Sequence, residues 1–307
     1  MKDKPTLEEL LEVQAHFGLP SPALVEKDWY VAQALAAITS VQMAPFRLVF
    51  GGGTALSRAN KLVNRMSEDI DLKIVSDEEP KRSALRHLRE SVTAALISAG
   101  FQFDPENPAH RHSRNESRHT IYQLPYEQII SGQGALRPEI QIETTVSSLR
   151  CPTIDLPVSS FVAEAFKRPA EISSISCVSV TETAAEKFVA LTRRTVVELA
   201  DAKGFRDPTL VRHIYDLHII RAHYDVAEVA MWAKQIMTQD AEELGNQFPT
   251  YRDNPIAETK RAIQALAGEA VYAERYASFL RDMVYGQSVN YADCIKTLKT
   301  IAKNLKD

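Results

Sequence analysis

The sequence has few cysteines, no long apolar run and no excess of positive charge, and each absence excludes a class of protein. Its three cysteines, Cys151, Cys177 and Cys294, are far apart and form no Cys-x-x-Cys pair. This pattern argues against a disulfide framework and against a thiolate zinc site. No stretch approaches the about 18 consecutive apolar residues that a membrane helix needs. The net charge of −4 argues against a uniformly basic nucleic-acid coat, while leaving room for a local basic patch.

A secretory signal is also missing from the N-terminus. The opening residues, "MKDKPTLEELLEVQ", carry acids where a signal peptide needs an apolar run. We therefore expect a cytoplasmic protein without a membrane partner. At 307 residues, 45% of them hydrophobic, the chain can bury the core of one or two globular domains.

Periodicity predicts a mixed first part and a helical second part. Amphipathic patterns favour helices over 6–17, 21–39 and 80–99, and strands are expected over 46–50, 69–75, 120–129 and 138–146. From about residue 181 to the end the pattern is almost entirely helical. We expect an α+β fold with two domains, 1–180 and 181–307.

A run of three glycines, Gly51 to Gly53, follows the strand expected at 46–50 and precedes "TALSRANKL" (54–62), expected to be a helix. Such a turn lets backbone N–H groups approach a phosphate, helped by the positive end of the helix dipole. Neither the Gly-Lys-Ser/Thr of a Walker A loop nor the G-x-G-x-x-G spacing is present. By itself the glycine run is more typical of a tight turn.

The strand over 69–75, "DIDLKIV", places apolar residues on one face and Asp69 and Asp71 on the other. Two carboxylates at i and i+2 of a strand lie roughly 7 Å apart and repel each other unless a cation lies between them. Oxygen ligands of this kind suit Mg²⁺ bound together with substrate phosphates. A solvent-facing strand edge is the alternative interpretation of the pair.

The order of these features is more specific than either one. Strand, glycine turn, helix and a strand with D-x-D resemble the DNA polymerase beta-like nucleotidyltransferase fold, a mixed sheet flanked by helices. That fold takes a third carboxylate from a neighbouring strand, and "IQIETT" supplies Glu143. Glu139 shares the same face, but it follows Arg137-Pro138 near the start of its strand. We therefore prefer Glu143.

Several motifs extend the resemblance to the AbiEii-type nucleotidyltransferase toxins, which include the MenT group. They run in the family's order across positions 25 to 220. The matching pieces are "VEKDWYVAQAL" (25–35), "FGGGTALSR" (50–58), "NRMSEDIDLKI" (64–74), "IQIETT" (140–145), "ETAAEKFVALTRR" (182–194) and "RHIYDLHII" (212–220).

The resemblance implies roles for particular residues of this sequence. Asp69, Asp71 and Glu143 would be catalytic and hold the metal, and Lys187 and Asp216 would complete the catalytic set from the helical domain. The expected nucleotide-binding residues are Gly52, Gly53, Thr54, Arg65, Ser67 and Lys187. Ser67 also matches a serine that is phosphorylated in some family members when the antitoxin is a kinase.

Some of these residues have a purely structural alternative. Lys187 follows a Thr183-x-x-Glu186 capping box and is then expected as an exposed lysine in a first helical turn. Asp216 stands one turn after Arg212 and is suited to a salt bridge with it. Ser67 is able to hydrogen-bond its own turn, and Arg65 to pair with the aspartates. We interpret 26–28, Glu-Lys-Asp, as a structural ion network.

The function implied by the resemblance is that of a bacterial toxin. A nucleotidyltransferase using an NTP and Mg²⁺ (or Mn²⁺) would transfer NMP, with the 3′ end of tRNA as the expected acceptor and a cognate antitoxin, binding or modifying the enzyme, as partner. A blocked acceptor end cannot be aminoacylated, which would arrest growth. The alternatives are transfer to a protein or a small molecule such as an antibiotic, and a non-catalytic NTP-binding module.

Two basic features leave the acceptor question open. "HRHSRNESRH" (110–119) is expected to be a loop, either solvated or in contact with RNA phosphates. A zinc site from its histidines lacks further ligands at the right spacing. The last helix carries lysines at spacings of 3, 4 and 3, a pattern more typical of a solvated face than of an RNA grip. These lysines are Lys296, Lys299, Lys303 and Lys306.

Overall fold

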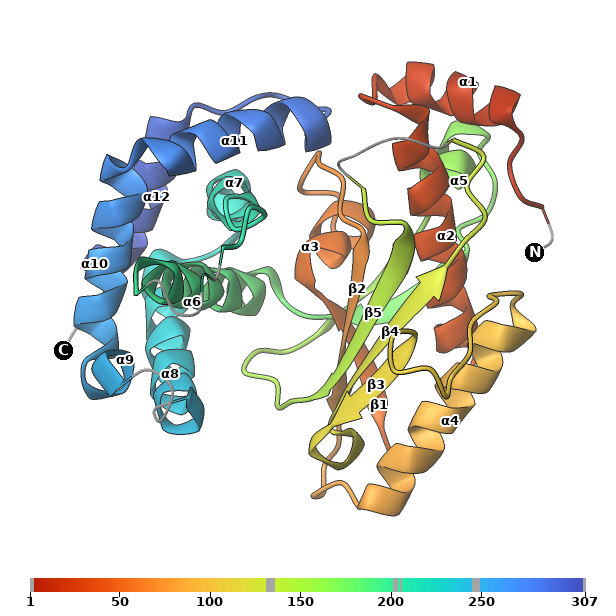
Figure 1. The fold of residues 1–307 in the computed structure, drawn as a ribbon, viewed down its shortest axis with the longest axis horizontal. Helices are drawn as coiled ribbons and strands as arrows, with labels where there is room; N and C mark the ends of the chain where they lie inside the picture. Colours follow the sequence, from red (N-terminus) through yellow and green to blue (C-terminus); the bar gives the residue numbers. More distant parts are fainter. Residues whose placement is uncertain (1–2, 131–135, 201–203, 205, 245–248, 306–307) are drawn as a thin grey trace. The chain divides into compact units, whose positions relative to one another are not determined.

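The computed structural model describes residues 3–130, 136–200, 204, 206–244 and 249–305. The chain forms two compact units, Met1–Val178 and Ser179–Asp307 (Figure 1). The boundary between the units lies two residues before the position at 180 where the sequence pattern changes. No helix in the described ranges has the length and apolarity to span a membrane.

The first unit is built around one mixed sheet of seven strands in the order β3-β4-β5-β2-β1-β7-β6. Its strands are β1 (Arg47–Gly51), β2 (Asp69–Val75), β3 (Arg111–Arg114), β4 (His119–Pro125), β5 (Glu139–Val146), β6 (Ile154–Val158) and β7 (Ile172–Cys177). Its helices are α1 (Leu7–Phe17), α2 (Pro22–Thr39), α3 (Gly52–Thr54), α4 (Arg82–Ser98) and α5 (Phe161–Ala165). The expected α+β class with a mixed, helix-flanked sheet is confirmed.

The centre of the sheet is β2, which pairs antiparallel with β1 and parallel with β5. One face of both strands is apolar: Ile70, Leu72, Ile140 and Ile142 are at most 2% exposed. Helix α2 packs against β2, β5 and α4 (Figure 1). Because side chains alternate along a strand, burial of this apolar face directs the polar residues of β2 and β5 to the opposite face.

Helix α2 begins one residue after the start of the expected range, with Ser21 as N-cap and Pro22 in the first turn. Three consecutive charged residues of this helix, Glu26, Lys27 and Asp28, are at most 3% exposed. Their partners confirm an ion network: Lys27 Nζ lies 3.0 Å from Glu68 Oε2, and Asp28 Oδ1 lies 3.1 Å from Arg58 Nε. The network ties α2 to the segment that joins the glycine turn to the D-x-D strand.

Three local expectations were wrong. The helix expected over 54–62 is short, because α3 continues only as a single π-helical stretch, Ala55–Ala59. The strand expected to reach residue 129 ends at Pro125, whose nitrogen has no hydrogen to donate. The loop expected over 110–119 contains β3, which pairs with β4.

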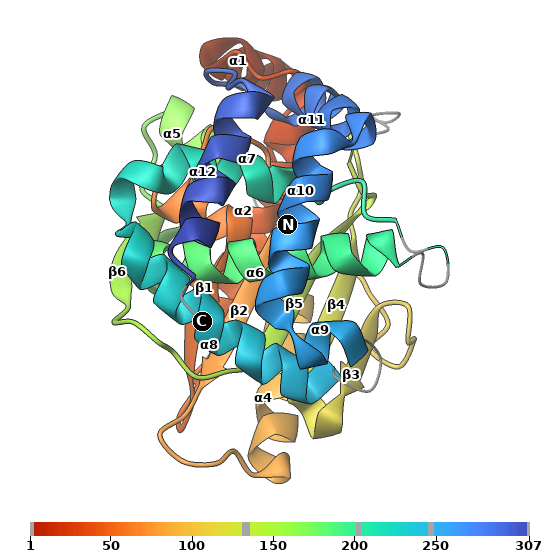
Figure 2. The same cartoon turned by 90° about the vertical axis from the view of Figure 1, so that its left-hand side faces the viewer.

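The second unit is helical, as expected from residue 181 onward. It consists of α6 (Val180–Leu199), α7 (Arg212–Ile219), α8 (Val226–Leu244), α9 (Pro249–Asp253), α10 (Pro255–Gly268), α11 (Ala270–Met283) and α12 (Tyr291–Lys303). Helix α6 packs against α7, α8 and α10, and α10 also packs against α12 (Figure 2). Among the described lysines of α12, Lys296, Lys299 and Lys303 are exposed, while Lys306 lies outside the described residues.

Candidate active site

The predicted carboxylates lie on one polar face of the two central strands. In the parallel pairing of β2 with β5, Asp71 lies directly opposite Glu143, and Asp69 lies opposite Gln141. Neighbouring strands are about 4.8 Å apart, so the Asp71 and Glu143 side chains leave adjacent backbone positions in the same direction. Glu139 lies two residues before Gln141 at the start of β5. The register therefore favours Glu143 as the third carboxylate.

The glycine turn lies directly against this carboxylate group. Gly51, the last residue of β1, is opposite Asp71 in the antiparallel register. Gly52 has a φ of +71°, which favours glycine, and a Cβ on Gly52 would overlap the Asp71 carboxylate at Oδ2. A Cβ on Gly53 would lie 2.7 Å from Ser67 Oγ. The absence of side chains at Gly52 and Gly53 is what allows the turn and the D-x-D strand to approach so closely.

Thr54 joins the turn to the segment that leads into β2. Its hydroxyl is hydrogen-bonded to Ser67 Oγ at 2.9 Å and to the Asp69 carbonyl oxygen. Arg65 is 2% exposed and donates from Nη1 to the Met66 carbonyl at 2.8 Å. Ser67 is 8% exposed. A kinase would therefore reach the Ser67 hydroxyl only after this segment opened.

Charged neighbours surround the carboxylates. Arg137 Nη2 pairs with Asp69 Oδ1, and Arg137 Nη1 donates to Gln141 Oε1 at 2.6 Å. His119 Nδ1 lies 3.5 Å from Glu143 Oε1 and 3.0 Å from the Thr145 hydroxyl. The negative charge of Asp69 is thus partly balanced by the Arg137 guanidinium.

The three carboxylates fit a divalent cation by donor type, because Mg²⁺ and Mn²⁺ prefer carboxylate oxygens. They project from one face of two registered strands, and no side chain stands at Gly52 to fill the space beside Asp71. Within the described residues, however, no three His, Cys, Asp or Glu side chains converge on one point. The guanidinium of Arg137 is the group that balances Asp69 here.

Lys187 and Asp216 form a second charged group, inside the helical unit. Lys187 Nζ on α6 lies 2.8 Å from Asp216 Oδ2 on α7, and the two side chains are 7% and 0% exposed. Helix α6 begins at Val180 with Ser179 as its N-cap, so the capping box expected at Thr183 was wrong. Lys187 is consequently two turns into the helix and buried, which also overturns the exposed-lysine alternative.

The arrangement of β1, the glycine turn and β2 has counterparts among known proteins. The family model described as "Nucleotidyl transferase AbiEii toxin, Type IV TA system" matches residues 33–301. This range covers most of both units. The chain belongs to the AbiEii nucleotidyltransferase toxin family.

A solved structure is similar to the AbiEii-family chain over almost its whole length. It is MenT4, a nucleotidyltransferase toxin from Mycobacterium tuberculosis H37Rv, with 15% sequence identity and a TM-score of 0.52. The match covers 97% of this chain and 99% of MenT4. No curated protein sequence matches the chain. Family membership makes the chain a nucleotidyltransferase toxin with an NTP substrate and an antitoxin partner.

One residue near the Lys187–Asp216 pair of this AbiEii-family chain was missed in the sequence. Both ring nitrogens of His213 on α7 are buried, and neither has a hydrogen-bond partner among the described residues. Burial and the charges of Lys187 and Arg212 hold the pKa of His213 well below its usual value. Its position one turn before Asp216 was visible in "RHIYDL", but its burial is a tertiary property.

The arginines and histidines of the basic segment 110–119 contact neighbouring residues of the AbiEii-family chain. Arg111 donates from Nη1 to Glu90 Oε2 and to the Thr93 hydroxyl, both at 3.0 Å. His119 faces Glu143, as described above, and His110 Nδ1 accepts from the Asp104 backbone N–H. The zinc alternative for these histidines has no support among the described residues.

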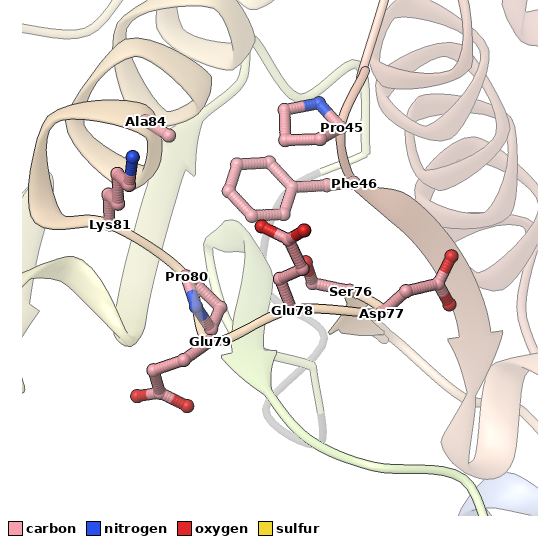
Figure 3. Close-up of a pocket in the computed structure, with 9 residues that line it drawn as sticks. All are labelled: Pro45, Phe46, Ser76, Asp77, Glu78, Glu79, Pro80, Lys81 and Ala84. Carbon is pink, nitrogen blue, oxygen red and sulfur yellow. The ribbon is translucent and has the colours of Figure 1, made fainter.

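A cavity of about 340 Å³ lies at the opposite end of β1 and β2 from the glycine turn (Figure 3). Its lining consists of Pro45, Phe46, Ser76, Asp77, Glu78, Glu79, Pro80, Lys81 and Ala84. The acidic residues 77–79 are exposed. None of the predicted site residues lines this cavity, so we do not assign it to the nucleotidyltransferase site.

Proposed function

We propose that this toxin transfers NMP from an NTP to the 3′ end of tRNA in a reaction that uses Mg²⁺ or Mn²⁺. The observation that carries the proposal is the register of β2 with β5, which sets Glu143 opposite Asp71 beside the side-chain-free Gly52. In a family of nucleotidyltransferases this is the carboxylate group suited to hold metal and triphosphate. tRNA and the enzyme meet in the cytoplasm, where we place the reaction.

The roles of the sheet residues follow from their positions. Asp69, Asp71 and Glu143 would hold the cation. The cation would offset the negative charge of the triphosphate and make the α-phosphorus more open to attack. Backbone N–H groups of Gly52 and Gly53 and the Thr54 hydroxyl would bind phosphate oxygens. The side chains of Arg65 and Ser67 lie against Gly53 and would hold this turn in place. The Glu143 side chain is 38% exposed, against 15% for that of Asp69.

Proton transfer and charge stabilisation need two further groups. Glu143 would accept the proton of the attacking hydroxyl, with His119 3.5 Å away to stabilise the carboxylate. Lys187 would balance the charge of the leaving pyrophosphate, and Asp216 fixes the Lys187 ammonium by the 2.8 Å contact.

The direct test supplies each of the four labelled NTPs with purified tRNA to three proteins: wild type, Asp69→Asn and Asp77→Asn. Asp77 is an exposed aspartate just beyond the far end of β2 and is the matched control. We expect labelled tRNA from wild type and Asp77→Asn, and about 10³-fold less from Asp69→Asn, the size of effect typical of losing one group that stabilises the transition state.

Other outcomes would redirect or reject the proposal. Periodate oxidation of the tRNA 3′ end must abolish labelling. Label in protein or small-molecule fractions would favour the alternative acceptors, and tight NTP binding without turnover would favour a non-catalytic module. No labelled RNA with any NTP would reject the proposal. The antitoxin, acting by direct binding or by modifying the enzyme, is expected from a neighbouring gene and should restore growth on co-expression.

A further inference from the structure

Arg137, at the turn into β5, contacts the predicted metal ligand Asp69. Its Nη2 pairs with Asp69 Oδ1, and its Nη1 donates to Gln141 Oε1 at 2.6 Å. Two further contacts go to Glu68: the Arg137 backbone N–H donates to Oε2 at 3.1 Å, and Nε lies 3.5 Å from Oε1. A positive group therefore occupies the Asp69 carboxylate that a divalent cation would use.

Two buried side chains, Lys27 and Glu68, hold the backbone of Arg137 in place. Lys27 is fully buried and donates from Nζ to the carbonyl oxygens of Arg137 and Glu139, at 2.6 and 2.7 Å. Lys27 Nζ also lies 3.0 Å from Glu68 Oε2, whose side chain is 9% exposed. These contacts fix both the start of β5 and the carboxylate beneath Arg137.

The Arg137 side chain is much less enclosed than its anchor. It is 36% exposed, whereas the side chain of Lys27 is 0% exposed. Ion pairs in contact with water exchange their partners at small cost. A guanidinium on a fixed backbone, with one exposed side, can therefore leave Asp69 without disturbing the sheet.

We propose that Arg137 is an exchangeable counter-ion of Asp69 that competes with the divalent cation and transfers to the triphosphate when metal and nucleotide bind together. The inference rests on the proposed function in one respect, that Asp69 is a metal ligand at the nucleotide site. A guanidinium binds phosphate oxygens in a bidentate manner, so the triphosphate is a suitable second partner. Glu68 and Gln141 keep Arg137 within reach of both.

This exchange couples the two ligands. A cation that binds alone must displace Arg137 from Asp69 and leaves the guanidinium with water and Glu68 as partners. A cation that arrives with a triphosphate offers Arg137 a new anion. The wild-type protein should therefore bind the metal weakly by itself and much more tightly with nucleotide.

The experiment measures Mn²⁺ binding without turnover, from the loss of the free Mn²⁺ signal in electron paramagnetic resonance. Wild type, Arg137→Gln and Arg118→Gln are titrated with and without a non-hydrolysable NTP analogue. Arg118 is the matched control, because it is 37% exposed and pairs with Glu79. Asp69→Asn in the Arg137→Gln background identifies the binding site, and thermal unfolding checks that each variant is folded.

Without nucleotide we expect Arg137→Gln to bind Mn²⁺ about tenfold more tightly than wild type, a ratio equivalent to ~1.4 kcal/mol. With the analogue this advantage should vanish, and the analogue itself should bind Arg137→Gln more weakly. Arg118→Gln should match wild type, and Asp69→Asn should remove the gain.

Equal or weaker Mn²⁺ binding by folded Arg137→Gln would overturn the inference, as would a gain that survives Asp69→Asn. An analogue affinity unchanged by Arg137→Gln would overturn the transfer to the triphosphate. The outcome is separable from that of the proposed function: a Mn²⁺ gain with no labelled RNA would reject the tRNA acceptor alone, and labelled tRNA with no Mn²⁺ gain would reject the role of Arg137 alone.

Discussion

The two units each hold an aspartate against a cationic side chain, but they shield these pairs from water to different degrees. In the sheet unit, the side chains of Arg137 and Asp69 are 36% and 15% exposed. In the helical unit, those of Lys187 and Asp216 are 7% and 0% exposed. A buried pair resists separation because each partner would be left as an unpaired charge, whereas a wetter pair can exchange partners. The comparison distinguishes a buried, fixed ion pair from a wetter one whose partners can exchange.

The largest expected effect tests this difference in stability. Asp216→Ala removes the carboxylate 2.8 Å from the buried Lys187 ammonium and should lower the free energy of unfolding by about 3–5 kcal/mol. Asp69→Ala should lower it by about 1 kcal/mol or less, since Arg137 can turn to water and Glu68. Urea denaturation of both variants measures the two values. Equal stability losses in the two variants would contradict the difference between the two ion pairs. As a control, Lys187→Met combined with Asp216→Ala should recover much of the stability lost in Asp216→Ala.

The second prediction separates the conformation of a glycine from its close contact with Asp71. Gly18 and Gly52 have φ values of +62° and +71°, but only at Gly52 would a Cβ meet a neighbouring group. Replacement by alanine should cost about 1–2 kcal/mol at each position for the left-handed conformation. Gly52→Ala should in addition displace the Asp71 carboxylate.

Nucleotidyl transfer, measured beside urea denaturation, distinguishes the two glycines. Gly52→Ala should lose transfer at least tenfold, a change of ~1.4 kcal/mol in the barrier, and Gly18→Ala should keep it. Full transfer by Gly52→Ala would show that the close approach of the turn to the D-x-D strand is dispensable.

The third prediction concerns a buried ion pair in the sheet unit. It tests whether burial, and not membership of one unit or the other, decides how an ion pair affects stability. Asp28 pairs with Arg58 in the sheet unit but is 3% exposed. Burial raises the pKa of Asp28 to about 6, against the lowering by Arg58. Between about pH 6 and the unfolded pKa near 4, the Asp28 carboxyl is protonated in the folded protein but ionised in the unfolded chain. Stability contributed by this proton increases as the pH falls.

Asp28→Asn cannot take up this proton and supplies the comparison. The stability of wild type relative to Asp28→Asn should increase by about 1 kcal/mol between pH 7 and pH 5. Urea denaturation at the two pH values measures the change. A constant difference between the two proteins would contradict the raised pKa of Asp28.

The smallest effect is expected at His213, whose buried ring nitrogens have no hydrogen-bond partner in the described ranges. An unsatisfied buried polar group destabilises the fold, so His213→Leu should be as stable as wild type or up to about 1 kcal/mol more stable. Thermal unfolding tests this, with the buried and hydrogen-bonded His218 as the control. A His218→Leu variant should lose stability, and an equal loss at His213 would show that its ring is already well satisfied.

The sheet and its carboxylates were largely predictable from sequence. Alternation in "DIDLKIV" and "PEIQIETTV" fixed which face of each strand is polar, and the polar face contained Asp69, Asp71 and Glu143. The register sets Glu143 opposite Asp71, and the choice of Glu143 over Glu139 stays a prediction. Its assigned chemistry remains part of the proposed function.

Other features depend on contacts between distant segments. The pairing of Lys187 with Asp216, the contact of Arg137 with Asp69 and the burial of His213 are set by packing that no local pattern encodes. The exposed-lysine interpretation of Lys187 failed because the helix starts earlier than the apparent capping box. The strand β3 was missed because charged residues depress strand propensity, while pairing with β4 supplies its hydrogen bonds.

The parallel pairing of β2 with β5 has a consequence for the synthesis of the toxin. Parallel neighbours need a long crossover, and here α4, β3 and β4 must all be translated between Asp71 and Glu143. The carboxylate group therefore stays incomplete while the nascent chain carries the glycine turn and D-x-D strand alone. On the ribosome, β2 can gain its parallel partner only after this whole crossover has been made.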